Sequence, residues 1–283
     1  MGNPTGPAPD HPALAAALAA VGRRADEMLR LTRAWVEINS YTQNVAGVNA
    51  VGAMLREAFA LPGLAGEVIE GGDGYGDHLV WRTQAATRAA PILLIGHHDT
   101  VFPPGHFEGW REDGGRATGP GALDMKGGLA VIRTALAALA EADALADLPV
   151  VVVSVADEEV GSPSSAPHLR ALARGAACAL VFESGRAADA IITRRKGVGA
   201  MTVTARGKAA HAGNNHKDGA NAIWALAKFI DAAQGLTDHA RGRTVNVGQA
   251  TGGTSKNTVP EHAECKLDLR YETVADAEGH YEL

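Results

Sequence analysis

Three short apolar runs place the strongest constraint on how this chain can fold. They are Ile92–Ile95, Val150–Val155 and Ala179–Phe182, and runs this continuous are typical of strands that are buried on both faces. Helical patterns separate them, at Met125–Ala142 and Ser164–Ala173, so strand and helix alternate as in a parallel sheet. We therefore predict the α/β class, with functional residues gathered beyond the carboxyl ends of the strands.

The rest of the chain predicts a tail, two leading helices and a second domain. Residues 1–10 contain three prolines and two glycines and suggest a mobile tail. The predicted helices are Ala13–Asn39 and Val45–Ala60, and a further strand is predicted at His78–Trp81. After Gly185 the order is strand, helix, strand, strand and the start of a helix, at Gly197–Arg206, Ala220–Gly235, Thr244–Ala250, Ala263–Tyr271 and Val274–Leu283. This order is part of a ferredoxin-like α+β module, so we predict domains at 11–190 and 191–283.

Charge and cysteine content limit the classes of partner and compartment. The formal net charge is -6 and the longest basic cluster is Arg194–Lys196, which argues against nucleic acid and an anionic membrane surface as partners. The apolar stretch Ala13–Gly22 is too short for a membrane span and lacks the preceding basic residues of a signal peptide. Cys178 and Cys265 lie far apart, so we predict two reduced core thiols in a cytoplasmic protein.

Polar residues with metal-binding chemistry follow each of the three apolar runs. His97 and Asp99 come after the first run, and the two-residue period of a strand puts them on one face, as a ligand and the carboxylate that orients it. Asp157–Glu159 follow the second run, and Glu183 follows the third. Each also has a plainer interpretation, as a satisfied polar pair at a strand end or as a solvated run of charges.

A glycine-rich loop, Gly119–Gly128, adds a further acid, Asp124. Asp124 suits the N-cap of the following helix, but a carboxylate with two oxygens can also bridge two metal ions. Together, the four side chains form an oxygen-rich set with one nitrogen that suits Zn²⁺, Mn²⁺ or Co²⁺: His97, Asp124, Glu159 and Glu183. The sequence has no nucleophile-elbow motif and no phosphate-binding glycine motif.

Taken together, the motifs resemble one family. They are His97-His-Asp99-Thr-Val, Gly119-Pro-Gly-Ala-Leu-Asp124-Met-Lys-Gly-Gly, Asp157-Glu158-Glu159-Val-Gly and Phe182-Glu183-Ser-Gly. They are similar to the motifs of the di-zinc metallopeptidase family of glutamate carboxypeptidase, aminoacylase, acetylornithine deacetylase and succinyl-diaminopimelate desuccinylase, and most similar to the glutamate carboxypeptidase branch. The resemblance covers nearly everything from about residue 30. It implies a three-layer, phosphorylase/hydrolase-like catalytic domain with a mostly parallel sheet, followed by a ferredoxin-like lid and dimerisation domain.

The resemblance also implies a role for each site residue. Asp124 would bridge two divalent ions, most often zinc, while His97 and Glu183 complete one site and Glu159 contributes to the other. Asp99 would support His97. Glu158 would be the general base that takes a proton from the water shared by the metals, so that hydroxide attacks an amide carbonyl, and that then protonates the leaving amine. Glutamate at position 183 is the pattern of carboxypeptidases and deacylases, which favours N-acyl amino acids or C-terminal amides as substrates.

The second domain continues the resemblance. Gly207–Gly213 is similar to the lid motif whose histidine, here His211, reaches the active site of a partner subunit and stabilises an oxyanion; the plainer interpretation is a surface histidine in a glycine turn. Asn257 and Arg270 also lie in matching motifs, and the fork of Arg270 could grip a substrate carboxylate. Alternatively, Asp268 and Arg270 could form a local ion pair. The resemblance implies a homodimer formed through the lid.

One feature departs from the family pattern. Family members complete the second metal site with a histidine near the carboxyl terminus, and the histidines of this chain other than those of the His97 and His211 motifs lie in no matching motif. We therefore expect an amino-terminal portion of a longer enzyme, with both domains incomplete and on the order of 100 residues missing. The predicted function is metal-dependent hydrolysis of the amide bond in a C-terminal, glutamate-like conjugate or an N-acyl amino acid. Two alternatives remain open: a deacetylase or desuccinylase of a biosynthetic amino acid, and a catalytically silent metal-binding, dimerising chain.

Overall fold

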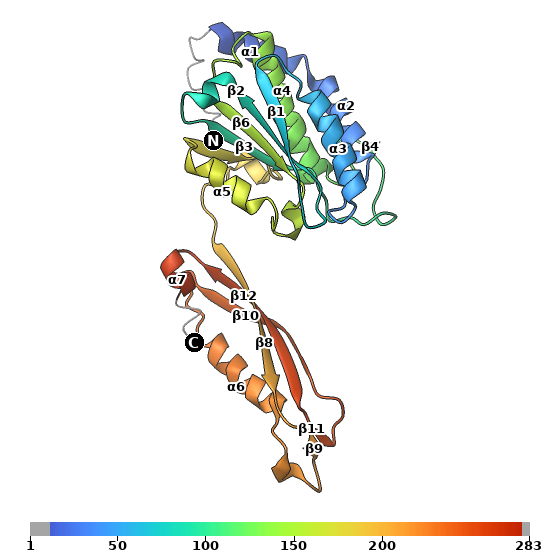
Figure 1. Ribbon diagram of the computed structural model, residues 1–283, viewed down its shortest axis with the longest axis vertical. Helices are drawn as coiled ribbons and strands as arrows, with labels where there is room; N and C mark the ends of the chain where they lie inside the picture. Colours follow the sequence, from blue (N-terminus) through green and yellow to red (C-terminus); the bar gives the residue numbers. More distant parts are fainter. Residues whose placement is uncertain (1–11, 279–283) are drawn as a thin grey trace. The chain divides into compact units, whose positions relative to one another are not determined.

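The computed structural model describes residues 12–278. The chain divides into two compact units, with the boundary between Ala187 and Ala188, and Figure 1 shows the elements of each unit. The tail predicted at 1–10 lies outside the described residues, as does the end of the helix predicted at Val274–Leu283. Within the described residues, no helix is both long and apolar enough to cross a membrane.

The first unit is built around a five-stranded sheet. Its main elements are α1 (Pro12–Gly22), α2 (Ala25–Val36), α3 (Val45–Ala58), β1 (Leu64–Ile69), β2 (His78–Thr83), β3 (Ile92–His97), β4 (Arg111–Asp113), β5 (Arg116–Thr118), α4 (Gly127–Glu141), β6 (Val150–Val155), α5 (Ala166–Arg174) and β7 (Cys178–Val181). The sheet order is β1-β2-β6-β3-β7. Strands β6, β3 and β7 are parallel neighbours, whereas β2 pairs antiparallel with both β1 and β6. The predicted α/β class is confirmed, and the sheet is mixed because β2 runs against the other four strands.

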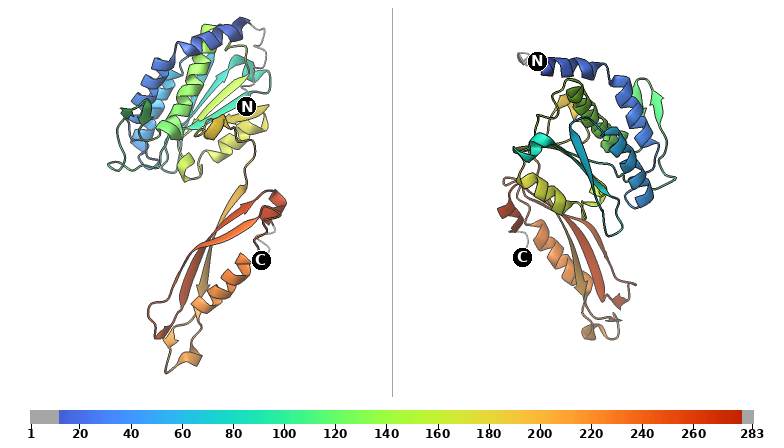
Figure 2. Two further views of the ribbon diagram at one scale, coloured as in Figure 1. Left: turned by 180° about the vertical axis from the view of Figure 1, so that it is seen from behind. Right: turned by 45° about the horizontal axis from the view of Figure 1, so that its top comes forward.

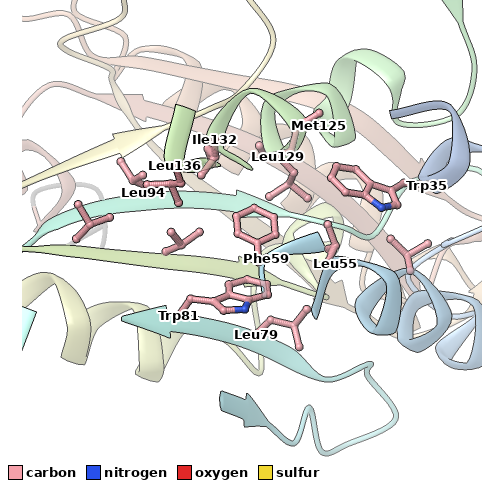
Figure 3. Packing of buried hydrophobic residues seen from close by; sticks show 14 of the residues in the cluster. Trp35, Leu55, Phe59, Leu79, Trp81, Leu94, Met125, Leu129, Ile132 and Leu136 are labelled. Atoms are coloured by element: carbon pink, nitrogen blue, oxygen red, sulfur yellow. The ribbon is translucent and has the colours of Figure 1, made fainter. Parts of the chain in front are cut away.

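Alternating side chains of the strands divide the apolar core between the two faces of the sheet. On one face, α2, α3 and α4 pack against Leu79, Trp81 and Leu94, and Figure 3 shows this cluster with Phe59 stacked on Trp81 at 4.5 Å between ring centroids. On the other face, residues such as Val80, Leu93 and Val151 pack against the partly buried leucines of α5. The two views in Figure 2 show the sheet of the first unit between its helices. This is the predicted three-layer arrangement, and it aligns the strands whose ends carry the candidate site.

The first predicted helix is wrong as a single element. The chain turns between α1 and α2 at Arg23 and Arg24, where the backbone N–H groups donate to carbonyls three residues earlier. Gly22 precedes the turn, and glycine weakens a helix interior. At the turn, the guanidinium groups of Arg23 and Arg24 each lie 2.6 Å from a carboxylate oxygen of Glu141 on α4. The apolar period continues across the turn, which is why the sequence pattern did not reveal it.

The predicted burial of the third apolar run is also wrong. All four residues of β7 are exposed, including Leu180 and Val181, whereas all six residues of β6 are buried. Strand β7 is an edge strand with β3 on one side only, and composition does not report a strand's position in its sheet. Cys178, at the start of β7, is exposed, so its prediction as a core thiol is wrong; Cys265 is buried as predicted.

The second unit has an antiparallel sheet covered by one helix. Its elements are β8 (Gly197–Arg206), β9 (Ala210–His211), α6 (Ala222–Gln234), β10 (Thr244–Gly252), β11 (Thr258–Val259), β12 (His262–Tyr271) and α7 (Val274–Glu278). The main sheet has the order β10-β12-β8, and α6 packs on it through Leu226 and Ala233 against Cys265 and Leu267. The three strands and the helix α6 predicted for this region are present, because alternation in the strands and the helical period of α6 are both strong, and the fifth predicted element begins as α7.

Candidate metal centre

The three parallel strands bring their polar ends to one edge of the sheet. His97 is the last residue of β3, Glu158 and Glu159 follow β6 in a short 3-10 turn, and Glu183 follows β7. Because β6, β3 and β7 are neighbours and run in the same direction, side chains beyond their carboxyl ends meet. The loop before α4 adds Asp124 to the same edge.

Five predicted site residues are close together there. Possible ligand atoms of His97, Asp124 and Glu159 all lie within 4.8 Å of one another. The Nε2 atom of His97 lies 3.1 Å from Oδ1 of Asp124, and 3.9 Å and 3.8 Å from carboxylate oxygens of Glu158 and Glu183. This three-residue group contains Glu159, which the resemblance assigned to a different metal from His97.

Asp99 orients the ring of His97. The Nδ1 atom lies 3.1 Å from the main-chain oxygen of Asp99 and 3.3 Å from its carboxylate Oδ1, and both side chains are buried. With acceptors at Nδ1, that nitrogen carries a proton, and whenever the ring is neutral its Nε2 lone pair faces the acidic residues. A carboxylate behind the imidazole is the usual support of a metal-binding histidine.

The acids repel one another, and the site favours a cation. Burial alone would lower the pKa of His97, but hydrogen bonding to Asp99 and the negative charges of Asp99, Glu158 and Glu183 raise that pKa to about 9. Burial raises the pKa of Glu159 to about 7, and nearby carboxylates contribute in the same direction while His97 opposes it. The pKa of Glu183 is likewise raised, first by burial. A divalent cation relieves this repulsion, and one imidazole with several carboxylates is a donor set for Zn²⁺, Co²⁺ or Mn²⁺. The residues present therefore fit a metal ion.

Asp124 does not serve as the N-cap of α4. Helix α4 begins at Gly127, and its N-cap position is occupied by Lys126, without a capping side chain. The plainer interpretation of Asp124 is thus wrong, and its carboxylate is more than half exposed beside His97. Close packing keeps the loop in place: a β-carbon at Gly128 would overlap the carbonyl oxygen of Phe182, and Gly121 has a φ of 75° that favours glycine.

A buried lysine fastens this loop to the end of α2. Lys126 is fully buried, and its Nζ donates to the main-chain oxygens of Trp35 and Ile38 at 2.9 Å and 3.2 Å. Burial lowers the pKa of Lys126 to about 7. No role was predicted for Lys126 from the sequence, although its position two residues after Asp124 in the glycine-rich motif was a signal that it bears on the site.

A second buried network braces the segment that carries Glu158. On β2, Nδ1 of His78 accepts the N–H of Ala156 at 3.1 Å, so Nε2 donates to the hydroxyl of Ser164 at 3.2 Å. The carboxylate of Asp157 accepts the N–H of Ser164 at 2.7 Å. Asp157 is fully buried, so the three consecutive acids have different tasks: Asp157 holds the turn, and the two glutamates face the candidate site.

The remaining predicted residues lie in the second unit. Strand β9 pairs with β11, which places His211 opposite Thr258, and the N–H of Ala212 donates to the carbonyl oxygen of Asn257 at 2.9 Å. His211 and Asn257 are therefore neighbours, although 46 positions separate them in the sequence. The Nδ1 atom of His211 accepts the N–H groups of Gly213 and Asn214 at 3.1 Å and 3.2 Å.

Arg270 makes the ion pair that the sequence left open as an alternative. Its Nε and terminal nitrogen donate to the two carboxylate oxygens of Asp268 at 2.8 Å and 3.1 Å. Both side chains are almost half exposed. A substrate carboxylate that binds to Arg270 must therefore compete with Asp268.

Comparison with known proteins matches both units to one group of enzymes. Residues 193–282 match a family model described as the peptidase dimerisation domain, M20_dimer. The chain is 30% identical over 246 residues to carboxypeptidase G2 of a Pseudomonas species, covering 83% of this chain and 58% of that protein. It is also 30% identical over 207 residues to succinyl-diaminopimelate desuccinylase 2 of Shewanella loihica, covering 65% of this chain and 54% of that protein. The chain thus spans a little over half the length of these relatives.

A solved structure shares the fold. The aminopeptidase PepT of Bacillus cereus superposes with a TM-score of 0.74 at 22% identity, covering 91% of this chain and 69% of that one. At this identity the likeness concerns the fold, and the relatives of higher identity carry the resemblance in sequence. The family resemblance that the four motifs predicted is confirmed.

Proposed function

Because the chain belongs to the M20 metallopeptidase family, we propose that the whole protein is a divalent-metal-dependent hydrolase of amide bonds. Its substrate is a C-terminal, glutamate-like conjugate or an N-acyl amino acid. The single observation that carries this proposal is the gathering of His97, Asp124 and Glu159 within 4.8 Å, with Glu158 and Glu183 beside them. In this proposal the first unit is the catalytic domain, and the second unit is a lid and dimerisation domain.

The metal centre would be held by His97, Asp124, Glu159 and Glu183. Asp124 is the candidate for a bridge between two ions, and zinc is the metal that we propose for both. A bound divalent cation would supply positive charge that polarises a carbonyl group and makes water more acidic. The residues contribute a fixed arrangement of donors, since Asp99 holds the ring of His97 and the packing of Gly128 holds the loop of Asp124.

Glu158 is the proposed general base and acid. Its carboxylate is nearly half exposed and lies 3.9 Å from Nε2 of His97, so it borders the donor cluster while remaining open to water. In the proposed reaction, a carboxylate oxygen of Glu158 takes a proton from water and then delivers it to the nitrogen of the leaving amine. A positioned carboxylate of this kind contributes about 10²- to 10⁴-fold to the rate.

The second unit would complete the active site of a partner in a homodimer. With Nδ1 of His211 accepting two backbone N–H groups, the Nε2 atom carries the proton of the neutral ring and is available to donate to a developing oxyanion. Asn257, its neighbour, would bind substrate, and Arg270 would bind a substrate carboxylate by exchanging it for Asp268. The match to a dimerisation domain supports this arrangement.

The two relatives support different substrates. The name of the Pseudomonas relative is that of a carboxypeptidase, and it favours a C-terminal amino acid conjugate. The name of the Shewanella relative is that of a desuccinylase, and it favours the alternative, removal of an acyl group from a biosynthetic amino acid. We place the carboxypeptidase first because its similarity extends over more of the chain.

A substrate panel with two variants tests the proposal. The zinc-loaded protein is assayed on N-acyl glutamates, benzoyl-glutamate conjugates, N-acetylornithine and N-succinyl-diaminopimelate. Glu158→Gln should reduce turnover by about 10²- to 10⁴-fold, whereas Glu57→Gln, at an exposed position on α3, should leave it unchanged. Equal turnover in Glu158→Gln and the original protein would remove Glu158 from the mechanism. Tight zinc binding without hydrolysis of any substrate would favour the catalytically silent chain.

A further inference from the structure

The carboxylate of Asp99 makes more contacts than support of His97 requires. Its Oδ1 lies 3.3 Å from Nδ1 of His97 and accepts the N–H of Glu158 at 3.2 Å. Its Oδ2 accepts the N–H of Glu159 at 3.2 Å and the hydroxyl of Thr42 at 2.8 Å. One buried carboxylate therefore links the imidazole at the end of β3 to the backbone of both glutamates after β6.

The hydrogen bond from the hydroxyl of Thr42 is the shortest of these contacts, and backbone hydrogen bonds fix the position of Thr42. Thr42 is fully buried, and its N–H donates to the carbonyl oxygen of Thr100 at 3.1 Å, while the N–H of Thr100 donates to Ser40 at 2.8 Å. The hydroxyl also lies 3.4 Å from the oxygen of Thr100, which is long for an O–H donor. Its hydrogen is thus directed to the charged Asp99 oxygen, where the bond is shorter and stronger.

The carboxylate of Asp99 needs such an anchor because its terminal torsion is soft. Rotation about the bond to a planar carboxylate has broad minima, and the two main-chain donors, from Glu158 and Glu159, belong to one short turn that can move with it. Thr42 comes from a separate segment, after α2. A donor from outside the turn fixes the plane of the carboxylate relative to the sheet.

We propose that Thr42 is a positioning residue of the metal centre, whose hydroxyl fixes the Asp99 carboxylate and thereby sets both the ring of His97 and the Glu158–Glu159 turn. The inference rests on the metal site of the proposed function. Thr42 acts through Asp99 and does not touch the reacting atoms. Loss of a residue that orients metal ligands typically weakens metal binding about 10- to 100-fold.

The test compares three variants of the 283-residue protein. Thr42→Val removes the hydroxyl at almost constant shape, and Thr42→Ser retains it. Thr32→Val is the matched control, because Thr32 is a buried threonine of α2 whose hydroxyl donates to the main-chain oxygen of Met28 at 2.8 Å. Zn²⁺ affinity is measured by calorimetry, and urea unfolding of the metal-free proteins separates local from global effects.

The expected result is a Zn²⁺ affinity about 10- to 100-fold weaker in Thr42→Val, with Thr42→Ser and Thr32→Val close to the original protein. Equal affinity in Thr42→Val and the original would overturn the inference. It would also be overturned if Thr42→Ser weakened binding as much as Thr42→Val, or if Thr32→Val did so, since packing or general loosening would then explain the loss.

A second measurement keeps the inference testable if the original protein binds no Zn²⁺, a result that would overturn the proposed function. Hydrogen exchange of the metal-free proteins is followed by NMR at the amides of Glu158 and Glu159, which donate to Asp99. Thr42→Val should speed exchange at these two amides by about tenfold relative to the amides of β6, through local opening. Unchanged exchange at both amides would overturn the role of Thr42, independently of metal binding.

Discussion

The two units treat their polar residues in opposite ways. In the part of the chain that the structure describes, the fully buried polar and charged side chains all belong to the first unit, among them His98, Asp99, Lys126 and Asp157. The candidate residues of the second unit, such as His211 and Asn257, are exposed. Both units have an apolar core between a sheet and helices, so the difference concerns the polar groups and not the way each core is built.

Buried polar groups are held in one position by their partners, whereas exposed polar groups remain free to bind other molecules. Hydrogen bonds offset the cost of burying a polar group, and each one removes freedom from the groups around it; the four donors around Asp99 illustrate this. An exposed group can change partner at small cost, as Arg270 would have to do between Asp268 and a substrate. In the proposed function, the first unit would hold the metal ligands in one arrangement, and the second would offer exposed groups to a substrate.

The largest expected effect is at the buried carboxylate. Asp99→Ala removes the carboxylate that accepts from the hydroxyl of Thr42 and from two main-chain N–H groups, and it leaves the ring of His97 with only the main-chain oxygen of residue 99. Removing one partner from a buried charge pair costs about 3–5 kcal/mol, so the urea midpoint of the metal-free protein should fall strongly. The measurement is tryptophan fluorescence, reported mainly by the buried Trp35 and Trp81. A loss below 1 kcal/mol would break the comparison, because Asp99 would then behave like an exposed residue.

The second-largest loss of stability is expected at Gly128, which packs closely against the backbone of Phe182. Gly128→Ala places a methyl group against the carbonyl oxygen of Phe182 and 2.7 Å from Cε of Met125. We expect a loss of about 1–3 kcal/mol from overpacking, which outweighs the gain in helix propensity of up to about 1 kcal/mol. In the second unit, Gly235→Ala meets its nearest atom at 3.3 Å and should be close to neutral. Similar thermal midpoints for the two variants would show that the loop has room to move.

The buried His98 makes stability depend on pH, and the expected effect is similar in size to that of Gly128→Ala. Burial lowers the pKa of His98 to about 3, and its Nδ1 lies 2.9 Å from the hydroxyl of Ser154. The unfolded chain takes up a proton at its ordinary pKa of about 6.5 while the folded chain does not, so stability is lost as the pH falls below 6.5. The contribution of His98 is about 2 kcal/mol at pH 5.

The contribution of Glu159 to the pH dependence of stability must be separated from that of His98. Its pKa is raised to about 7, so its protonation in the folded state adds stability over the same pH range. The prediction therefore concerns a difference in stability: between pH 6.5 and pH 5, the metal-free original should lose about 1.6 kcal/mol more than His98→Gln. The exposed His262 of the second unit supplies the control, His262→Gln, which should follow the original. Parallel pH curves for the original and His98→Gln would contradict the buried neutral state of His98.

The smallest effect is expected at the exposed ion pair. Asp268→Ala removes the acceptor of Arg270, but both side chains are almost half exposed, so the cost in urea unfolding should be below about 1 kcal/mol. For the proposed enzyme the same change frees Arg270 and should tighten the binding of a substrate carboxylate, seen as a lower KM with little change in kcat. A raised KM would indicate that Asp268 itself takes part in positioning the substrate.

Much of the fold could be predicted from local patterns. The continuous run Val150–Val155 predicted β6, and the alternation in Gly197–Arg206 predicted β8, because burial on two faces or one leaves a period in the sequence. The turn at Arg23 and Arg24 was missed, since its reason is partly the distant Glu141. The exposure of β7 was missed because position at the edge of a sheet is a property of the assembled strands.

The candidate site divides in the same way. His97, Asp124, Glu159 and Glu183 were predicted because each follows an apolar strand or a glycine-rich loop, positions where polar side chains are otherwise difficult to explain. Thr42 and Lys126 were not predicted: nothing in its own segment marks Thr42, and the glycine-rich motif around Lys126 does not show what its side chain contacts. Their importance comes from a hydroxyl that reaches Asp99 and an ammonium group that reaches Trp35, across 57 and 91 positions of the chain.

By itself the sequence indicated which residues are candidates for metal-binding chemistry and which family the chain resembles, since ligand type, spacing and strand ends are local properties. The tertiary structure decided what holds those residues in place. It brought Glu159 within reach of His97 and Asp124, directed the hydroxyl of Thr42 to Asp99 from another segment, and paired Arg270 with Asp268. The physical reason is that hydrogen bonds and burial act between neighbours in space, and the order of residues along the chain does not specify those neighbours.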